Sequence, residues 1–76
     1  MMVAFVAINC SPGRVLEVVK NTIGKPGVVE AYAIAGEFDA IAKVQGPDVQ
    51  AISRIIADGI QTLDGVVRTS TWLVIT

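Results

Sequence analysis

Hydrophobic positions along this chain follow two different spacings. Four short segments rich in Val, Ile, Ala and Phe are bounded by turn residues, which is typical of β-strands. Between them, apolar residues recur every three or four positions, as they do on one face of a helix. The pattern predicts strands over Met2–Asn9, Val28–Gly36, Ala40–Gln45 and Val66–Ile75, with one helix after the first strand and one after the third.

The first helix is expected to begin at Ser11-Pro12, with the serine as N-cap and the proline at the first helical position. Gly24 is expected to end this helix, and Pro26-Gly27 to turn the chain toward the next strand. Its predicted buried face consists of Val15, Leu16, Val18, Val19 and Ile23.

The second helix is expected to open at Gly46-Pro47-Asp48, where the helix dipole favours a carboxylate in the first turn. Gly59 should cost this helix about 1 kcal/mol relative to alanine, and close packing is the only reason that the sequence offers for it. Asp64-Gly65 then turns the chain. The predicted buried face consists of Val49, Ile52, Ile55, Ile56, Ile60 and Leu63.

The order of these elements is β-α-β-β-α-β. The link Gly36–Asp39 is too short to join parallel strands, so the strands on either side of it form an antiparallel hairpin. Gly27-Val28-Val29 and Gly65-Val66-Val67 each follow a helix and enter a strand, so the two halves resemble each other. The expected fold is α+β, a ferredoxin-like sandwich in which two helices cover one face of an antiparallel four-stranded sheet.

The face of the sheet that the helices leave open should be polar in a monomer. On the first two strands, neither alternating set of residues forms a charged row. An apolar open face of several hundred Å² is usually an interaction site. The sequence therefore predicts a homodimer in which two sheets meet face to face in a barrel-like association, with alanines and valines at the contact.

Composition supports self-association and excludes several other kinds of site. A chain of 76 residues has a marginal core on its own, and its single cysteine and lack of histidine exclude an internal disulfide and an ordinary zinc site. Six basic and seven acidic residues are spread evenly, without the basic patch of a nucleic-acid binder. No stretch is typical of a signal peptide or a membrane span, and a lone free cysteine fits a reducing cytoplasm.

Few residues could carry catalysis. Cys10 has no histidine to activate it and is expected to be a small structural residue. Glu37 and Asp39 at the hairpin tip could act as an acid–base pair, or they could simply be solvated turn residues. The glycines do not match any phosphate-binding spacing, and nothing indicates that acidic residues converge on a metal, so no cofactor is expected.

Two places could bind a small polar ligand. At the tip, Gly36 leaves backbone N–H groups open to a carboxylate, and Asp39 can pair with an ammonium group, so an amino acid would suit both. The alternative is a plain turn. On the last strand, the hydroxyls of Thr69, Ser70 and Thr71 precede Trp72. They could donate to a ligand at a subunit junction, or they could belong to an ordinary edge strand with the tryptophan in the core.

Several segments together resemble the C-terminal effector domain of Lrp/AsnC-type transcriptional regulators, called RAM. They are Lys25–Tyr32, the tip Gly36-Glu37-Phe38-Asp39 with Ile41–Val44, and the strand Gly65–Val74 with its Gly-Val-x-x-Thr-x-Thr motif. The resemblance covers residues 1–76 as a single domain and includes no helix-turn-helix. It therefore implies a stand-alone effector module that is not expected to bind a promoter directly, and the hydropathy of the chain predicts no contact with a membrane.

The resemblance also implies how such a module works. It implies dimers that assemble into octamers or decamers and an amino acid effector bound between dimers. The module would then act through mixed assembly with a full-length Lrp/AsnC regulator as a partner, or through ligand sensing alone. The positions that match the effector site of the family are Gly36, Glu37, Asp39, Thr69, Thr71 and Trp72. Two alternatives stay open at this point: a ferredoxin-like dimeric monooxygenase or isomerase that needs no cofactor, and an oligomer with a purely structural role.

Overall fold

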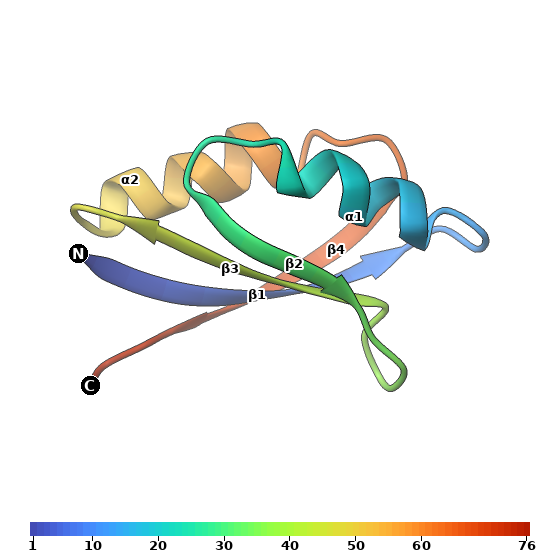
Figure 1. Cartoon of the computed structure of the whole chain (residues 1–76), viewed down its shortest axis with the longest axis horizontal. Helices are drawn as coiled ribbons and strands as arrows, with labels where there is room; N and C mark the ends of the chain where they lie inside the picture. Colours follow the sequence, from blue (N-terminus) through green and yellow to red (C-terminus); the bar gives the residue numbers. More distant parts are fainter.

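The strands form one antiparallel sheet, and both helices lie on the same side of it (Figure 1). The computed structural model describes all of residues 1–76. The strands are β1 (Met2–Cys10), β2 (Val28–Ala33), β3 (Ala40–Gly46) and β4 (Val66–Leu73), in the spatial order β2-β3-β1-β4. The helices are α1 (Val15–Ile23) and α2 (Val49–Arg54), and α2 continues into the π-helical segment η1 (Ile55–Ile60). This arrangement confirms the predicted ferredoxin-like fold.

Strand β1, one of the two inner strands of the sheet, pairs with β3 on one side and with β4 on the other. Its first residues pair with the end of β3 (Met2 with Gly46) and with the end of β4 (Ala4 with Leu73). Its last residues lie beside the start of β3, where Ile8 pairs with Ala40. Both chain termini therefore lie at one end of the sheet, and the β2–β3 connection lies at the other (Figure 1).

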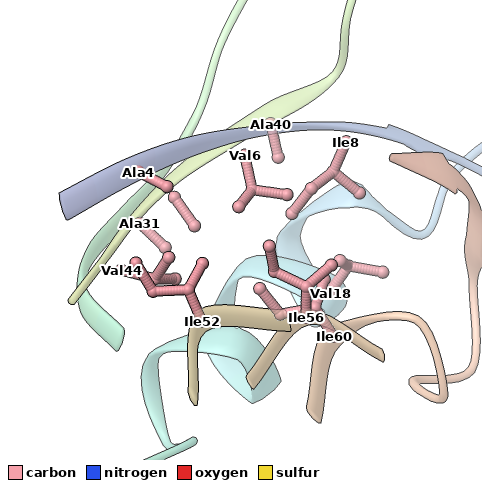
Figure 2. Packing of buried hydrophobic residues seen from close by; sticks show 11 residues of the cluster. Ala4, Val6, Ile8, Val18, Ala31, Ala40, Val44, Ile52, Ile56 and Ile60 are labelled. Atoms are coloured by element: carbon pink, nitrogen blue, oxygen red, sulfur yellow. The ribbon is translucent and has the colours of Figure 1, made fainter. Parts of the chain in front are cut away.

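The core lies between the sheet and the helices (Figure 2). Isoleucines from α2 and η1 and one valine from α1 point toward the strands, which contribute mostly small residues. Small residues in the sheet let large helical side chains interdigitate with it at native density. The buried cluster consists of Ala4, Val6, Ile8, Val18, Ala31, Ala40, Ala42, Val44, Ile52, Ile56 and Ile60.

The start of α1 differs from the prediction. Arg14, not Ser11, is the N-cap, and the Ser11 backbone instead accepts a hydrogen bond from the Arg14 N–H at 3.0 Å. Gly13, with φ of 79°, allows this tight turn before the helix. The predicted buried face was also wrong at Leu16 and Ile23, which are 74% and 54% exposed.

A residue missing from that predicted face is fully buried. Thr22 lies in the core, and its hydroxyl donates to the Val18 carbonyl at 2.7 Å within the same helix. A hydroxyl that is hydrogen-bonded in this way can be buried without a desolvation penalty. The hydrophobic pattern of the sequence therefore missed Thr22 as a buried residue.

The second helical segment begins with a side-chain cap. The Asp48 carboxylate accepts a hydrogen bond from the Ala51 N–H at 2.8 Å, and Val49, which was expected to be buried, is about half exposed. In η1 the backbone widens, so that the Gln61 N–H donates to the carbonyl of Ile56, five residues earlier. Gly59 lies in η1, and a Cβ there would make only an ordinary 3.8 Å contact with Lys25, so close packing does not explain this glycine.

The strand ends and one register also differ from the prediction. β2 ends at Ala33 rather than Gly36, β3 extends to Gly46, and β4 ends at Leu73 rather than Ile75. In β2, Val28 pairs with Val44 and Glu30 with Lys43, so Val29 is an extra, bulged residue. The bulge reverses the alternation that the sequence pattern assumed at the start of this strand.

The open face of the sheet therefore has a different composition from the predicted one. Most alanines of the strands lie on the helix side, and the open face carries aromatic residues among charged ones. Trp72 pairs with Phe5 on this face and is 64% exposed, so it is not a core residue. The aromatic and charged side chains of the open face are Phe5, Glu30, Tyr32, Lys43, Arg68 and Trp72.

Two glycines with positive φ provide a matched test of close packing. We expect Gly27→Ala to lower the free energy of unfolding by about 2 kcal/mol, because it adds an overlap with the Ile55 side chain to the strain of a φ of 85°. Gly13→Ala, at φ 79° with nothing within 4 Å, should lose only about 1 kcal/mol. Urea unfolding of both variants at one protein concentration measures the difference, and equal losses would contradict the packing argument.

Candidate functional site

The connection between β2 and β3 is a loop over residues 34–39, and it carries unused hydrogen-bond donors. In Figure 1 it bends away from the helices at the end of the sheet opposite the termini. Gly36 has φ of 156°, which L side chains rarely adopt, and the N–H groups of residues 35–38 make no hydrogen bond within the chain. Adjacent free N–H groups in a turn can bind an anion such as a carboxylate.

Asp39 fastens this loop to the central strand. Its Oδ2 accepts a hydrogen bond from the Cys10 N–H at 2.7 Å, and its own N–H donates to the Ile8 carbonyl at 2.9 Å. Its other carboxylate oxygen has no partner within the chain. The side chain therefore has a structural role and still offers one oxygen to a cation.

Asn9 links the loop to β4, a role that the sequence pattern did not predict. Its amide nitrogen donates to the Glu37 carbonyl at 3.2 Å, and its amide oxygen accepts from Arg68 at 3.2 Å. The signal for this residue in the sequence was weak, since it is the one polar residue in an otherwise apolar strand. Glu37 itself is exposed, and its carboxylate makes no hydrogen bond.

Cys10 is a protonated thiol in this setting. Partial burial raises its pKa above the ordinary value, and the nearby Asp39 carboxylate raises the pKa further, because a thiolate there would be poorly solvated and repelled. A thiol with a raised pKa is a weak nucleophile. The geometry agrees with the structural role expected for this residue.

The predicted residues on β4 lie on opposite faces of the strand. Thr69 and Thr71 pair with Ile8 and Val6, so they point to the helix side, whereas Trp72 points to the open face. The Thr69 hydroxyl accepts a hydrogen bond from the Gln61 amide at 2.9 Å. The six predicted site residues thus occupy three places within one chain: the loop, the helix side of β4 and the open face.

A groove runs between β4 and the α2–η1 helical segment, and we call it the β4 groove. Its volume is about 320 Å³, which lies at the lower end of the range for ligand sites. It is open at the surface because β4 is an edge strand. Its lining consists of Val49, Ile52, Ser53, Ile56, Ala57, Gln61, Thr71 and Leu73.

Neither a metal site nor a membrane span is found in the structure. No three His, Cys, Asp or Glu side chains lie close enough together to hold a metal ion. None of the helices has the length and apolar character needed to cross a membrane.

The comparison with known families decides the classification. The sequence model of the Lrp/AsnC ligand binding domain matches residues 3–76. The chain belongs to this family. An uncharacterised HTH-type transcriptional regulator of Pyrococcus horikoshii is 35% identical over 71 residues, which are 90% of this chain and 47% of the regulator. The chain thus spans about half the length of the curated relatives that it matches.

Solved structures share the fold of this chain. The protein TTHA0845 of Thermus thermophilus is 34% identical and superposes with a TM-score of 0.94, covering 100% of this chain and 95% of its own. A transcriptional regulator of Neisseria meningitidis, crystallised as a complex with L-Met, has a TM-score of 0.86 at 21% identity, with 99% of this chain and 50% of its own covered. At that identity the second likeness shows the shared fold alone.

The thiol next to Asp39 gives a pH-dependent prediction. We expect the alkylation rate of Cys10 by iodoacetamide to rise with a midpoint above that of a free thiol, because the raised pKa keeps the reactive thiolate scarce at neutral pH. Asp39→Asn should lower the midpoint only in part, since burial is the larger cause and stays in place. Glu37→Gln is the control and should leave the midpoint unchanged. A midpoint unaltered by Asp39→Asn would show that the carboxylate does not act on the thiol.

Proposed function

We propose that this chain is an amino acid-binding, self-associating regulatory module of an Lrp/AsnC-type transcription system. The observation that carries the proposal is the loop over residues 34–39, which contains both free backbone N–H groups and an unpaired oxygen of Asp39. The first can hold a carboxylate and the second an ammonium group, which are the two charges that every free amino acid has. The family membership and the L-Met complex of a regulator with this fold support the same class of ligand.

The effector site is proposed to form between protomers. Within one chain the loop and the threonines lie on different sides of the sheet, so no single ligand is surrounded by both. A loop from one protomer placed over the β4 groove of another would combine them. Gly36, Glu37 and Asp39 would then contribute from one protomer, Thr69 and Thr71 from the next, and Trp72 would belong to the assembly contact.

Self-association is proposed to begin on the open face of the sheet. Phe5, Tyr32 and Trp72 are 37%, 55% and 64% exposed there, which is a large amount of unprotected aromatic surface for a small domain. Two such faces meeting in a dimer would bury it. We propose that dimers assemble further into an octamer or decamer, and that the module acts in the cytoplasm.

Regulation would then pass through protein contacts. The described residues form one domain, and its matched relatives are HTH-type regulators about twice its length. We propose that this domain acts through mixed assembly with such a full-length regulator. No catalytic role is proposed, because Asp39 is tied to the backbone of β1, the Cys10 thiol has a raised pKa and Glu37 is solvated.

The dimer surface can be tested with two substitutions on opposite sides of the molecule. Trp72→Asp places a charge on the open face and should convert the assembly to monomers, whereas Leu16→Asp, on the outer side of α1, should leave its mass unchanged. Light scattering after size exclusion measures both. A monomeric unmodified protein, or an assembly that tolerates Trp72→Asp and not Leu16→Asp, would contradict the proposed surface.

The ligand claim can be tested by calorimetric titration with the common amino acids. We expect at least one to bind with a dissociation constant below the millimolar range. Thr71→Val, which removes one hydroxyl while keeping the side-chain shape, should weaken that binding by about tenfold, the effect of one lost hydrogen bond. Ser70→Ala, on the other face of the same strand, is the matched control and should bind as before. If no amino acid binds, the proposed function is wrong.

A further inference from the structure

The β4 groove is lined without a single charged residue. Five of its side chains are apolar, and the other three, Ser53, Gln61 and Thr71, are polar and neutral. The charged neighbours on the same helical segment, Arg54 and Asp58, line a different cavity beside the α1–β2 turn. The charged residues of this helical segment thus lie outside the groove, and Arg68 lines a separate neighbouring cavity.

The polar groups at the groove have hydrogen-bonding capacity to spare. The hydroxyls of Ser53 and Thr71 make no hydrogen bond within the chain. Gln61 donates from its amide nitrogen to Thr69, and its amide oxygen has no partner. Neutral groups of this kind can contact a ligand atom, but they cannot compensate a buried charge.

The π-helical turn positions two of the residues that line the groove, Gln61 and Ala57. Gln61 follows η1, and the bond from its N–H to the Ile56 carbonyl sets the wide turn that brings its side chain to β4. Ala57, in the same turn, is exposed, and its small side chain leaves the groove open between the helical segment and β4. Such π-helical turns occur frequently at functional sites.

We propose that the β4 groove receives the side chain of the effector and selects amino acids whose side chains are uncharged, at the expense of Lys, Arg, Asp and Glu. This inference rests on the proposed function, which supplies the α-ammonium and α-carboxylate partners from the loop of a neighbouring protomer. A charged side chain entering the groove would lose hydration and meet no opposite charge among the residues that line it. A neutral side chain loses little and gains contact with the apolar floor.

Pairs of ligands of similar shape and different charge test the selection directly on the unmodified, assembled protein. L-lysine has the linear four-carbon side chain of L-norleucine with an ammonium group added at its end. L-glutamine and L-glutamate differ by an amide and a carboxylate. In calorimetric titrations we expect the neutral member of each pair to bind at least tenfold more tightly.

A substitution in the groove tests its location. Ala57→Asp introduces one carboxylate into the groove and should weaken L-norleucine and strengthen L-lysine, each by about tenfold. Leu16→Asp adds the same charge on α1 and should leave both dissociation constants as they were. Light scattering and circular dichroism establish that each variant is folded and assembled, and the ligand pairs decide the selection even if Ala57→Asp fails to fold.

The outcomes separate this inference from the proposed function. If amino acids bind but the charged member of each pair binds as well or better, neutral selection is wrong while the proposed function stands. If neutral amino acids are preferred and Ala57→Asp acts like Leu16→Asp, the side chain is received elsewhere and the groove assignment is wrong. If no amino acid binds at all, the inference and the proposed function fail together.

Discussion

Large helical side chains packed on small strand residues hold this molecule together. Ile52, Ile56 and Ile60 leave the α2–η1 segment at intervals of four residues and reach the sheet where its central strands carry alanines (Figure 2). Each buried isoleucine contributes about 1.5–3 kcal/mol, and alanine beneath it allows the helix to approach closely. A larger residue at one of these alanines would push the helical layer away from the sheet.

The alternation of side chains that builds this core also places the remaining residues of β4 on two different faces of the sheet. Because Val6 and Ile8 must point to the helices, their partners Thr71 and Thr69 do so as well, and Trp72 is forced to the opposite face. Polar groups suited to a small ligand therefore lie beside the helices, and an aromatic residue suited to a protein contact lies on the open sheet. One strand thus serves two surfaces without a conflict between them.

The architecture was predictable from the sequence because it depends on coarse patterns. Element order, the antiparallel hairpin and the single helical layer follow from spacing and turn residues, and all three agree with the structure. The family resemblance carried by the loop and the threonine strand is confirmed by the family match.

Finer features depended on interactions that a linear pattern does not contain. The bulge at Val29 changes which residues face the helices, and only the pairing with β3 reveals it. Thr22 is buried because its hydroxyl finds a carbonyl in its own helix. The loop residues were identified correctly as neighbours, but the attachment of Asp39 to Cys10 and of Asn9 to Arg68 joins segments far apart in the chain.

The position of the termini has a consequence for modular construction. Both ends of the chain emerge at one end of the sheet, and the loop over residues 34–39 lies at the opposite end (Figure 1). A segment joined at Met1 would therefore start at the end of the sheet opposite the loop and its free N–H groups. The same domain can therefore be carried alone or within a chain of twice its length while its proposed sensing end stays accessible.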